Sequence, residues 1–336
     1  MLSRVANCLY WMSRYMERAE NTARLLDVNL QLMLDFEGLD DESLTSHWMP
    51  IVACSGQSEL FKKLYASTDS HSVQEFMTFN QENPNSILSC ISAARENARM
   101  VRDQIPVEMW EVINGTYHML RNQSTDKIVA SGAYEFFDGL KRDTMLFQGL
   151  TDSTFTHDKG YKFIQAGKFL ERADQTSRII DIKYHMLLPE ANDIGGAVDL
   201  AQWMAVLRSC SAFDAYHHRY VSDIQPWFVA EFLILSQNFP RSIRFCVSTL
   251  DYHLRSITST GGNQFSNAAE QVSGRLRSEL IYTTIEEIIQ EGLHEYLDRI
   301  QLRLMELIDS IVKTYIQQPE IDIALEIEQQ QHQQQQ

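Results

Sequence analysis

The sequence lacks both flexible linkers and long apolar runs. Its 336 residues include only 14 Gly and 7 Pro, and no stretch rich in Gly, Ser or Pro separates one part from another. No apolar run approaches the roughly 20 residues that a bilayer-spanning helix needs. Because 44% of the residues are hydrophobic, a typical globular fraction, we expect one compact body with a substantial core and no membrane segment.

Basic residues are scarce relative to acidic ones. The chain has 29 Lys and Arg against 45 Asp and Glu, which gives a formal net charge of −16. Binding to phosphate backbones or anionic membranes depends on a basic surface that releases counterions. The charge therefore argues against nucleic acid and membranes as partners, while local basic clusters are still compatible with it.

Cysteines are few, odd in number and never spaced as C-x-x-C. Neither a disulfide framework nor a zinc ribbon is indicated, and we expect small buried core residues. The N-terminal region lacks the apolar stretch and cleavage site of a secretory signal, and it carries Glu17 and Glu20, which mitochondrial presequences avoid. These features predict a cytoplasmic location. The five cysteines are Cys8, Cys54, Cys90, Cys210 and Cys246.

Recognisable catalytic signatures are also missing. The chain has no Walker-type phosphate loop, no G-x-G-x-x-G, no G-x-S-x-G and no H-E-x-x-H. Glu291 and His294 have the Glu-x-x-His spacing of helical di-iron sites, but such sites need a second copy, and Asp214 with His217 is a poor substitute. We expect no metal and no cofactor, and the motifs leave open whether the protein is an enzyme.

What the sequence does contain is one segment that occurs twice. Residues 15–28 and 169–182 are identical at six of fourteen positions, 154 residues apart, and exchange similar residues at most others. The likeness continues in register, because Pro84-Asn85-Ser86-Ile87 matches Pro240-Arg241-Ser242-Ile243, and Cys54 and Cys90 match Cys210 and Cys246. We interpret this as a duplicated unit of about 155 residues whose copies pack around a pseudo-twofold axis.

The hydrophobic pattern predicts an all-α fold, an internally duplicated bundle of long antiparallel helices. Apolar residues recur at three- and four-residue steps from Leu2 to about Phe36, and a matching long helix is predicted from about Asp158 to Leu188. We assign residues 1–155 and 156–318 to the two repeats, and we expect disorder in the glutamine-rich tail, residues 319–336. The other predicted helices are 43–54, 71–80, 85–104, 107–122, 126–149, 197–217, 226–237, 241–258, 267–282 and 284–317.

The repeated helix carries matched charges on one side. At 100° per residue, Glu17, Glu20, Asn21, Arg24 and Asp27 share an arc opposite the apolar stripe, and the second copy repeats the pattern. A solvent-exposed face laced by i,i+4 pairs is the simpler explanation. Since exposure gives little reason to repeat residue identity, we favour a buried or cleft-lining ion-pair network, which is either structural or part of a ligand site.

Two further basic clusters stand out in so acidic a chain. Arg95, Arg99 and Arg102 share one helical face and either bind an anionic ligand or pair with the carboxylates of the repeated helix. A third cluster holds Arg275 and Arg277, with His294 on the following segment. The candidate ligand-binding residues are thus Glu17, Arg18, Arg24, Glu171, Arg172, Arg178, Arg95, Arg99, Arg102, Arg275, Arg277 and His294.

At these motifs the chain resembles the bacterial alpha-E proteins, a helical family named for its Glu-Arg pair. The resemblance reaches to about Ile316 and implies a gene neighbourhood with a circularly permuted ATP-grasp protein and often a transglutaminase-like protein. It implies no catalytic residues. The residues that carry it are Glu17-Arg18, Glu171-Arg172, Arg95-Glu96-Asn97-Ala98-Arg99, Trp110-Glu111, Pro240-Arg241-Ser242-Ile243, Phe265-Ser266-Asn267, Gly274-Arg275-Leu276-Arg277 and Gly292-Leu293-His294-Glu295.

Three functions follow from the residues and the resemblance together. The first is a ligand-binding or docking partner of an ATP-grasp ligase in amide-bond or peptide metabolism, which recognises carboxylate or phosphate through the arginines. The second is an enzyme that forms or cleaves amide bonds with Glu17 or Glu171 as general base. The third is a scaffold in which the ion pairs only fix how the repeats dock. The sequence leaves the ligand and the oligomeric state open.

Overall fold

Helices form all the regular structure of the described part of the chain. The computed structural model describes residues 3–35, 41–185, 196–220, 224–261 and 264–317. Within these ranges it has sixteen α-helices, a short π-helical turn at Val312–Ile316 and no strand, which confirms the predicted all-α class. None of these helices is both long and apolar enough to cross a membrane.

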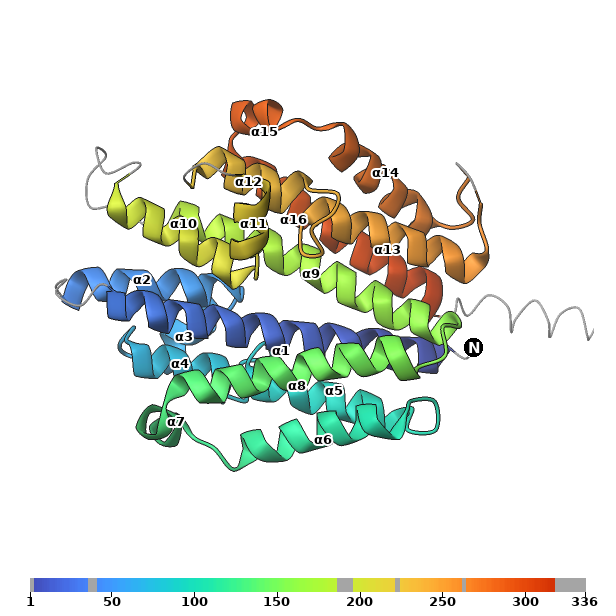
Figure 1. The fold of residues 1–336 in the computed structure, drawn as a ribbon. Helices are drawn as coiled ribbons and strands as arrows, with labels where there is room; N and C mark the ends of the chain where they lie inside the picture. The colour runs from blue at the N-terminus through green and yellow to red at the C-terminus, as the bar shows by residue number, and fades with distance from the viewer. Residues whose placement is uncertain (1–2, 36–40, 186–195, 221–223, 262–263, 318–336) are drawn as a thin grey trace, which may run out of the picture.

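The first eight helices lie on one side of the molecule and the last eight on the other (Figure 1). The first set is α1 (Ser3–Asp35), α2 (Asp41–Cys54), α3 (Ser58–Leu64), α4 (Ser70–Thr78), α5 (Ile87–Met100), α6 (Val107–Arg121), α7 (Thr125–Ser131) and α8 (Ala133–Thr154). The second set is α9 (Lys159–His185), α10 (Ala197–Ser209), α11 (Phe213–Arg219), α12 (Pro226–Leu235), α13 (Ile243–Thr258), α14 (Ala268–Tyr282), α15 (Ile285–Glu291) and α16 (Leu293–Ile311).

The two long helices α1 and α9 lie side by side through the middle of the molecule (Figure 1). They run in the same direction, since Tyr10 faces Gly167 and Arg14 bonds Glu171. The prediction of antiparallel neighbours is therefore wrong for this central pair. It is right for α8 on α1, where Lys141 reaches Asp27 and the later Gln148 reaches the earlier Glu17.

The other helices enclose this central pair in a matching way. Helices α5 and α8 pack on α1, and α13 and α16 pack on α9. Helix α6 then covers α5 and α8, as α14 covers α13 and α16. Helix α2 packs mainly on α9 and α10 mainly on α1, so each short helix crosses to the opposite long one. Because every layer touches a long helix or its neighbour, the apolar side chains merge into one main core.

Local sequence sets where the helices begin. The side chains of Ser86 and Ser242 accept hydrogen bonds from the backbone N–H groups of Ser89 and Phe245, so each caps the helix that follows its proline turn. The turns themselves match, because Ser86 N–H donates to the carbonyl of Asn83 and Ser242 N–H donates to that of Phe239. Equivalent capping therefore positions α5 and α13.

Three predicted helices are each interrupted in the structure. Gly132 and Gly292 adopt φ of +102° and +105° and split the helices predicted at 126–149 and 284–317. Glycine adopts positive φ without a steric cost, which explains these breaks. The helix predicted at 197–217 breaks at Ser211, where φ is 50°. Helix α3, at Ser58–Leu64, was not predicted at all.

Some predictions fall outside the described residues. These include the disordered tail at 319–336 and the last residues of the long helix that we predicted to end at Leu188. The predicted boundary at 155/156 lies in the short connection between α8 and α9. All five cysteines are buried and free, as expected of small core residues. Burial raises the pKa of the thiols at Cys54, Cys90, Cys210 and Cys246 to about 12.

Gly167 offers a test of the close approach of α1 and α9. A Cβ atom there would lie 2.4 Å from the carbonyl oxygen of Tyr10, so the two helices would have to separate. We expect Gly167→Ala to lower the free energy of unfolding by about 1–3 kcal/mol, as overpacked cores do. Urea unfolding followed by circular dichroism measures this.

Gly139, in the middle of α8, is the matched control. A Cβ atom there would meet nothing within 4 Å. Gly139→Ala should therefore stabilise the protein by about 0.5–1 kcal/mol, the usual gain from replacing glycine in a helix. Equal effects of the two substitutions would contradict the close approach.

Candidate functional site

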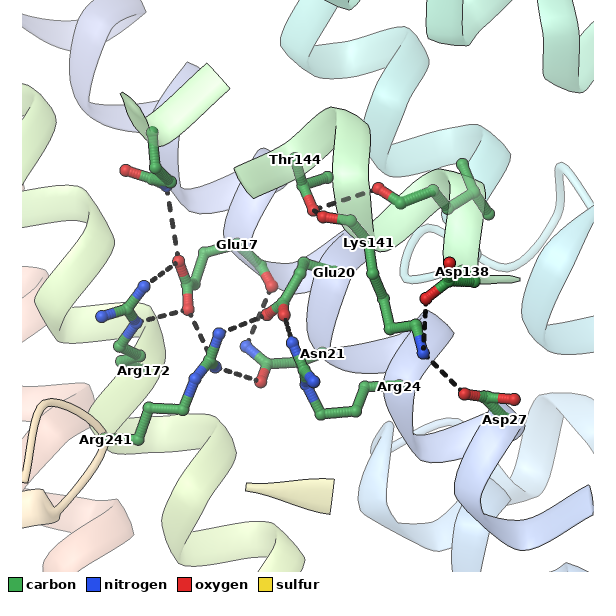
Figure 2. A network of polar contacts seen from close by, with 12 residues as sticks. Glu17, Glu20, Asn21, Arg24, Asp27, Asp138, Lys141, Thr144, Arg172 and Arg241 are labelled. Atoms are coloured by element: carbon green, nitrogen blue, oxygen red, sulfur yellow. Dashed lines mark hydrogen bonds and ion pairs between the residues drawn. The ribbon is translucent and has the colours of Figure 1, made fainter. Parts of the chain in front are cut away.

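Glu17 lies between arginines of the opposite half of the chain (Figure 2). Arg172 of α9 donates from Nε to Oε1 at 2.6 Å and from Nη2 to Oε2 at 3.1 Å, which is a bidentate pair. Arg241, in the turn before α13, donates from Nη1 to Oε1 at 3.2 Å. One carboxylate of α1 thus joins two separate elements of the second half.

Glu171 makes the reciprocal contacts from α9 to α1. Arg18 donates from Nε to Oε1 at 2.6 Å and from Nη2 to Oε2 at 3.0 Å. Arg14 donates from Nε to Oε2 at 2.8 Å. Arg18 also donates from Nη1 to Asn85 Oδ1 at 2.7 Å, in the turn before α5. Each Glu-Arg pair of the sequence therefore holds the other across the junction.

Both glutamates are sealed from solvent. Glu17 is 2% exposed and Glu171 is fully buried. Burial alone would raise the pKa of each carboxyl group, but the two arginines bonded to each one outweigh burial and hold its pKa well below the ordinary value. Both carboxylates are therefore ionised at neutral pH, and the arginines bonded to them use much of their hydrogen-bonding capacity within the network.

The network extends along α1 from Glu17. Glu20 lies between Arg241, whose Nη2 donates at 2.7 Å, and Arg24, which bonds the other oxygen (Figure 2). Asn21 Oδ1 accepts from Arg241 Nη1 at 3.0 Å. The buried Nε of Arg24 has no hydrogen-bond partner among the described residues, and burial lowers the pKa of Arg24 to about 10.

The same positions of α9 are occupied differently. Arg178 donates from Nε to Asp174 at 3.0 Å and is 27% exposed at its side chain. Gln175 donates to Glu171 Oε1 at 3.1 Å. Asp181 accepts from His294 Nδ1 at 2.6 Å, whereas Asp27 of α1 binds Lys141 at 2.7 Å. The i,i+4 pairs Glu20 with Arg24 and Asp174 with Arg178 both form, but most of their members are interior.

The alternative of a solvent-exposed charged face is consequently wrong. Helix α1 is buried on both sides, since its apolar stripe faces the core and its charged side faces the other half. The same holds for α9 around Glu171 and Asp174. The prediction of a buried ion-pair network is confirmed.

Two cavities flank the junction of α1 and α9. One, of about 220 Å³, is lined by Arg14, Arg18 and Arg178, by the single carboxylate of Asp174, and by neutral polar groups such as Asn85. The other, of about 200 Å³, is lined by Glu17, Glu20, Arg172, Arg241 and the amide of Gln148. Charges of opposite sign are equal in number in the second cavity, whereas arginines outnumber carboxylates in the first. We name the first the arginine cavity.

The cluster on α5 does not reach this junction. Arg95 donates to Asn114 at 2.8 Å and lies over the ring of Tyr117, and Arg99 pairs with Glu96 at 2.7 Å. Arg102 lies over the ring of Trp110. The predicted pairing with carboxylates of the repeated helix is therefore wrong, because these arginines face α6 and their own helix.

The third cluster is spread over several helices. Arg275 is exposed, and Arg277 lies 3.6 Å from Asp251 on α13. His294 binds Asp181, and this hydrogen bond raises the pKa of the imidazole. Arg275, Arg277 and His294 therefore do not form one site with the Glu-Arg pairs.

One group of three side chains in the described ranges has the spacing of cation ligands. Donor atoms of Asp181, His294 and Asp298 all lie within 4.8 Å of one another. Glu291 of the Glu-x-x-His spacing is elsewhere engaged, because Arg299 binds both of its oxygens at 2.8 Å. Any cation at this group would bind through Asp181, His294 and Asp298, without Glu291.

Sequence reasoning missed several residues of the junction. Arg14 and Lys168 occupy matching positions, 154 residues apart, and Arg241 matches Asn85 in the repeated proline turn. Lys168 is buried, and burial lowers its pKa. The signal was present, since a second basic residue occurs one turn before each Glu-Arg pair.

With the reciprocal Glu-Arg contacts established, comparison with known proteins identifies the group to which the chain is related. Residues 1–316 match the Alpha-E family, described as a predicted alpha-helical domain with a conserved ER motif. The chain belongs to the Alpha-E family. Its two Glu-Arg dipeptides, at Glu17 and at Glu171, form the centre of the fold. No solved structure matches the chain.

Uncharacterized proteins of Mycobacterium bovis and of two strains of Mycobacterium tuberculosis are similar to this Alpha-E chain. Each is 23% identical over 340 residues, which cover 94% of this chain. The chain spans only 37% of the length of these relatives. In them, the matching region is therefore one part of a much longer protein.

Removal of Glu171 tests whether the fold depends on the crossed pairs. Glu171→Ala leaves Arg14 and Arg18 with no carboxylate partner in a buried site, and breaking a buried pair in this way costs roughly 3–5 kcal/mol. We expect a loss of this size in urea unfolding. Glu171→Gln should lose less, because its amide oxygen still accepts a hydrogen bond.

Glu59 provides the surface control. Its ion pair with Lys62 is exposed on both sides, so Glu59→Ala should change the free energy of unfolding by no more than about 0.5 kcal/mol. A loss below about 1 kcal/mol for Glu171→Ala would show that the junction does not depend on this carboxylate.

Proposed function

We propose that this Alpha-E chain is a non-catalytic binding and docking module of an ATP-grasp system that forms amide bonds, and that it holds an acidic group of its ligand in the arginine cavity. The observation that carries the proposal is the composition of that cavity. Arg14, Arg18 and Arg178 line it, against the one carboxylate of Asp174. An excess of guanidinium donors in a polar recess suits a carboxylate or a phosphate.

Arg178 is the donor best placed to take a ligand. Its Nε binds Asp174, while its two terminal nitrogens have no hydrogen-bond partner among the described residues. Arg18, by contrast, uses Nε and both terminal nitrogens on Glu171 and Asn85. We therefore assign the charge-bearing contact to Arg178 and the positive surroundings to Arg14 and Arg18.

The state of the glutamates weighs against the enzyme alternative. A general base must be able to accept a proton near neutral pH. Glu17 and Glu171 are buried, and their bonded arginines hold their pKa values far below that range. Neither carboxylate supports proton abstraction in this arrangement, so a binding role fits the junction better.

A structural role for the pairs themselves has its own support. Each glutamate is buried and binds two arginines, and such paired buried charges can fix how the two halves of the chain pack together. The matching order, capping and packing of the helices support our interpretation that the halves are duplicated copies about a pseudo-twofold axis. We infer that the pairs hold the copies together while the adjoining cavity binds the ligand.

The relatives support a docking role. A region that forms 37% of longer proteins works beside other parts of the same chain. We propose that this chain likewise works beside an ATP-grasp protein, and also a transglutaminase-like protein. Five free, buried cysteines fit the cytoplasm, where thiols stay reduced.

The ligand part of the proposal is tested on Arg178. Succinate and inorganic phosphate are titrated into the protein by calorimetry, and at least one should bind. Arg178→Ala should weaken that binding at least tenfold, because a charge-assisted hydrogen bond contributes roughly 1.5–3 kcal/mol. Arg178→Lys should recover part of the affinity, since it keeps the charge and loses the planar fork.

Arg142 supplies the control for this titration. It is 80% exposed at its side chain, pairs only with Asp138 among the described residues and lies outside the cavity lining. Arg142→Ala should bind the same anion as tightly as the unchanged protein. Equal binding by Arg178→Ala, or no binding of either anion by the unchanged protein, would contradict the proposal.

The docking part is tested separately. The chain should co-elute in gel filtration with the ATP-grasp protein that the family resemblance places beside it, when both are present at micromolar concentration. An ATP-grasp enzyme from an unrelated operon is the control and should elute apart. Separate elution of the cognate pair would refute docking while leaving the ligand test unaffected.

A further inference from the structure

A larger groove lies in the second half, apart from the arginine cavity. It has a volume of about 940 Å³ and lies among α11, α12, the turn before α13 and the start of α15. Pockets for small molecules in proteins usually have about 300–1,000 Å³. The groove is therefore large enough for an organic ligand of several functional groups.

One wall of this groove is aromatic. Phe232 and Phe239 stack with ring centroids 4.9 Å apart, and Tyr220 meets Phe232 edge to face at 6.2 Å. All three line the groove. The exposed parts of these rings, small at Phe232 and Phe239 (6% and 8%) and larger at Tyr220, offer an apolar surface of fixed shape, which suits the flat or bulky part of a ligand.

The first half has the matching rings of Tyr65 and Phe76, which meet edge to face at 5.8 Å, but its turn lacks the third ring. Asn83 stands where the second half has Phe239, as the equal hydrogen bonds from Ser86 and Ser242 show. The Asn83 side chain is fully buried and donates to the carbonyl of Phe76 at 3.0 Å, which closes the end of α4. In the first half, Asn83 hydrogen-bonds a backbone carbonyl. At the corresponding position of the second half, Phe239 lines the groove.

A second difference places a charge beside the rings. Arg244 lines the groove two residues after the cap of α13, where the first half has the buried Leu88 after its own cap. Arg244 is half-buried, and its only hydrogen bond among the described residues goes to the carbonyl of Leu235 at 3.4 Å. It has no ion pair there, unlike the arginines of the central junction.

Two carboxylates also line the groove, and neither neutralises Arg244. Glu231 accepts a hydrogen bond from the hydroxyl of Tyr220 at 2.9 Å, and Glu286 is exposed on α15. Neither forms an ion pair with Arg244 in the described structure. The guanidinium of Arg244 thus has spare donors next to the aromatic wall, and Arg219 and His218 add basic groups to the same groove.

We propose that this groove binds a small organic acid that carries an aromatic or bulky apolar group. Arg244 takes its carboxylate, and Phe232 and Phe239 take its ring. The two substitutions that distinguish this half from the first, phenylalanine for asparagine and arginine for leucine, supply these two contacts. This site is separate from the arginine cavity and does not rest on the function proposed above.

The first half provides the test variants. Phe239→Asn and Arg244→Leu each introduce the residue that the equivalent turn already accommodates, so both should keep the fold, which melting curves verify. Calorimetric titration uses 3-phenylpropionate, 3-phenylpropanamide and propionate as probes. We expect saturable binding of 3-phenylpropionate, and at least tenfold weaker binding of the amide, which lacks the charge, and of propionate, which lacks the ring.

The variants assign the two contacts. Arg244→Leu should weaken binding of 3-phenylpropionate at least tenfold, and Phe239→Asn at least fivefold. Arg142→Ala, which lies outside both this groove and the arginine cavity, should leave it unchanged and is the control. No saturable binding, equal binding of acid and amide, or unchanged affinity in a folded Arg244→Leu protein would overturn the proposal.

Discussion

The reciprocal contact of two Glu-Arg pairs is the constraint on which the fold depends. Glu17 and Glu171 are ionised in the interior, and each is tolerated there only because two guanidinium groups of other elements bind it. These bonds fix the lateral position of α1 against α9, while Gly167 allows the helices to come close enough for side chains to reach across. Steric fit and charge pairing therefore specify the same register.

That register also determines what surrounds the junction. The turns that precede α5 and α13 supply Asn85 to Arg18 and Arg241 to Glu17, so the outer helices attach to the centre through polar contacts as well as the core. Thr176 of α9 donates to the backbone carbonyl of Arg241 at 2.8 Å, which holds that turn in place. The groove lined by Phe239 adjoins the same turn, so its shape depends indirectly on the central ion pairs.

Much of this arrangement could be predicted from the sequence, because it depends on local pattern. Period-3.6 spacing located the long helices, and repeated residue identity at Glu17 and Arg18 indicated burial of charge. The breaks at Gly132 and Gly292 were not predicted, because the residues on either side of each glycine keep a helical hydrophobic pattern. Only the backbone of the folded chain shows that φ exceeds +100° there. Which arginines meet which carboxylates depends on long-range packing. Arg95 contacts α6 instead. Arg14, one helical turn before the first Glu-Arg pair, and Arg241, in the proline turn before α13, bind the glutamates.

The positions where the halves differ are as informative as those where they agree. Glutamate and arginine recur at the crossed pairs, whereas Asn85 corresponds in the sequence to Arg241, Arg14 to Lys168 and Leu88 to Arg244. Arg14 and Arg241 bond the sealed glutamates themselves, whereas Arg244 lines the groove away from the junction. The Glu-Arg pairs of the junction can vary little, because an unpaired buried charge is costly. The groove lined by Arg244 and Phe239 is free of that constraint, so its residues can differ from Leu88 and Asn83 at the corresponding positions of the first half.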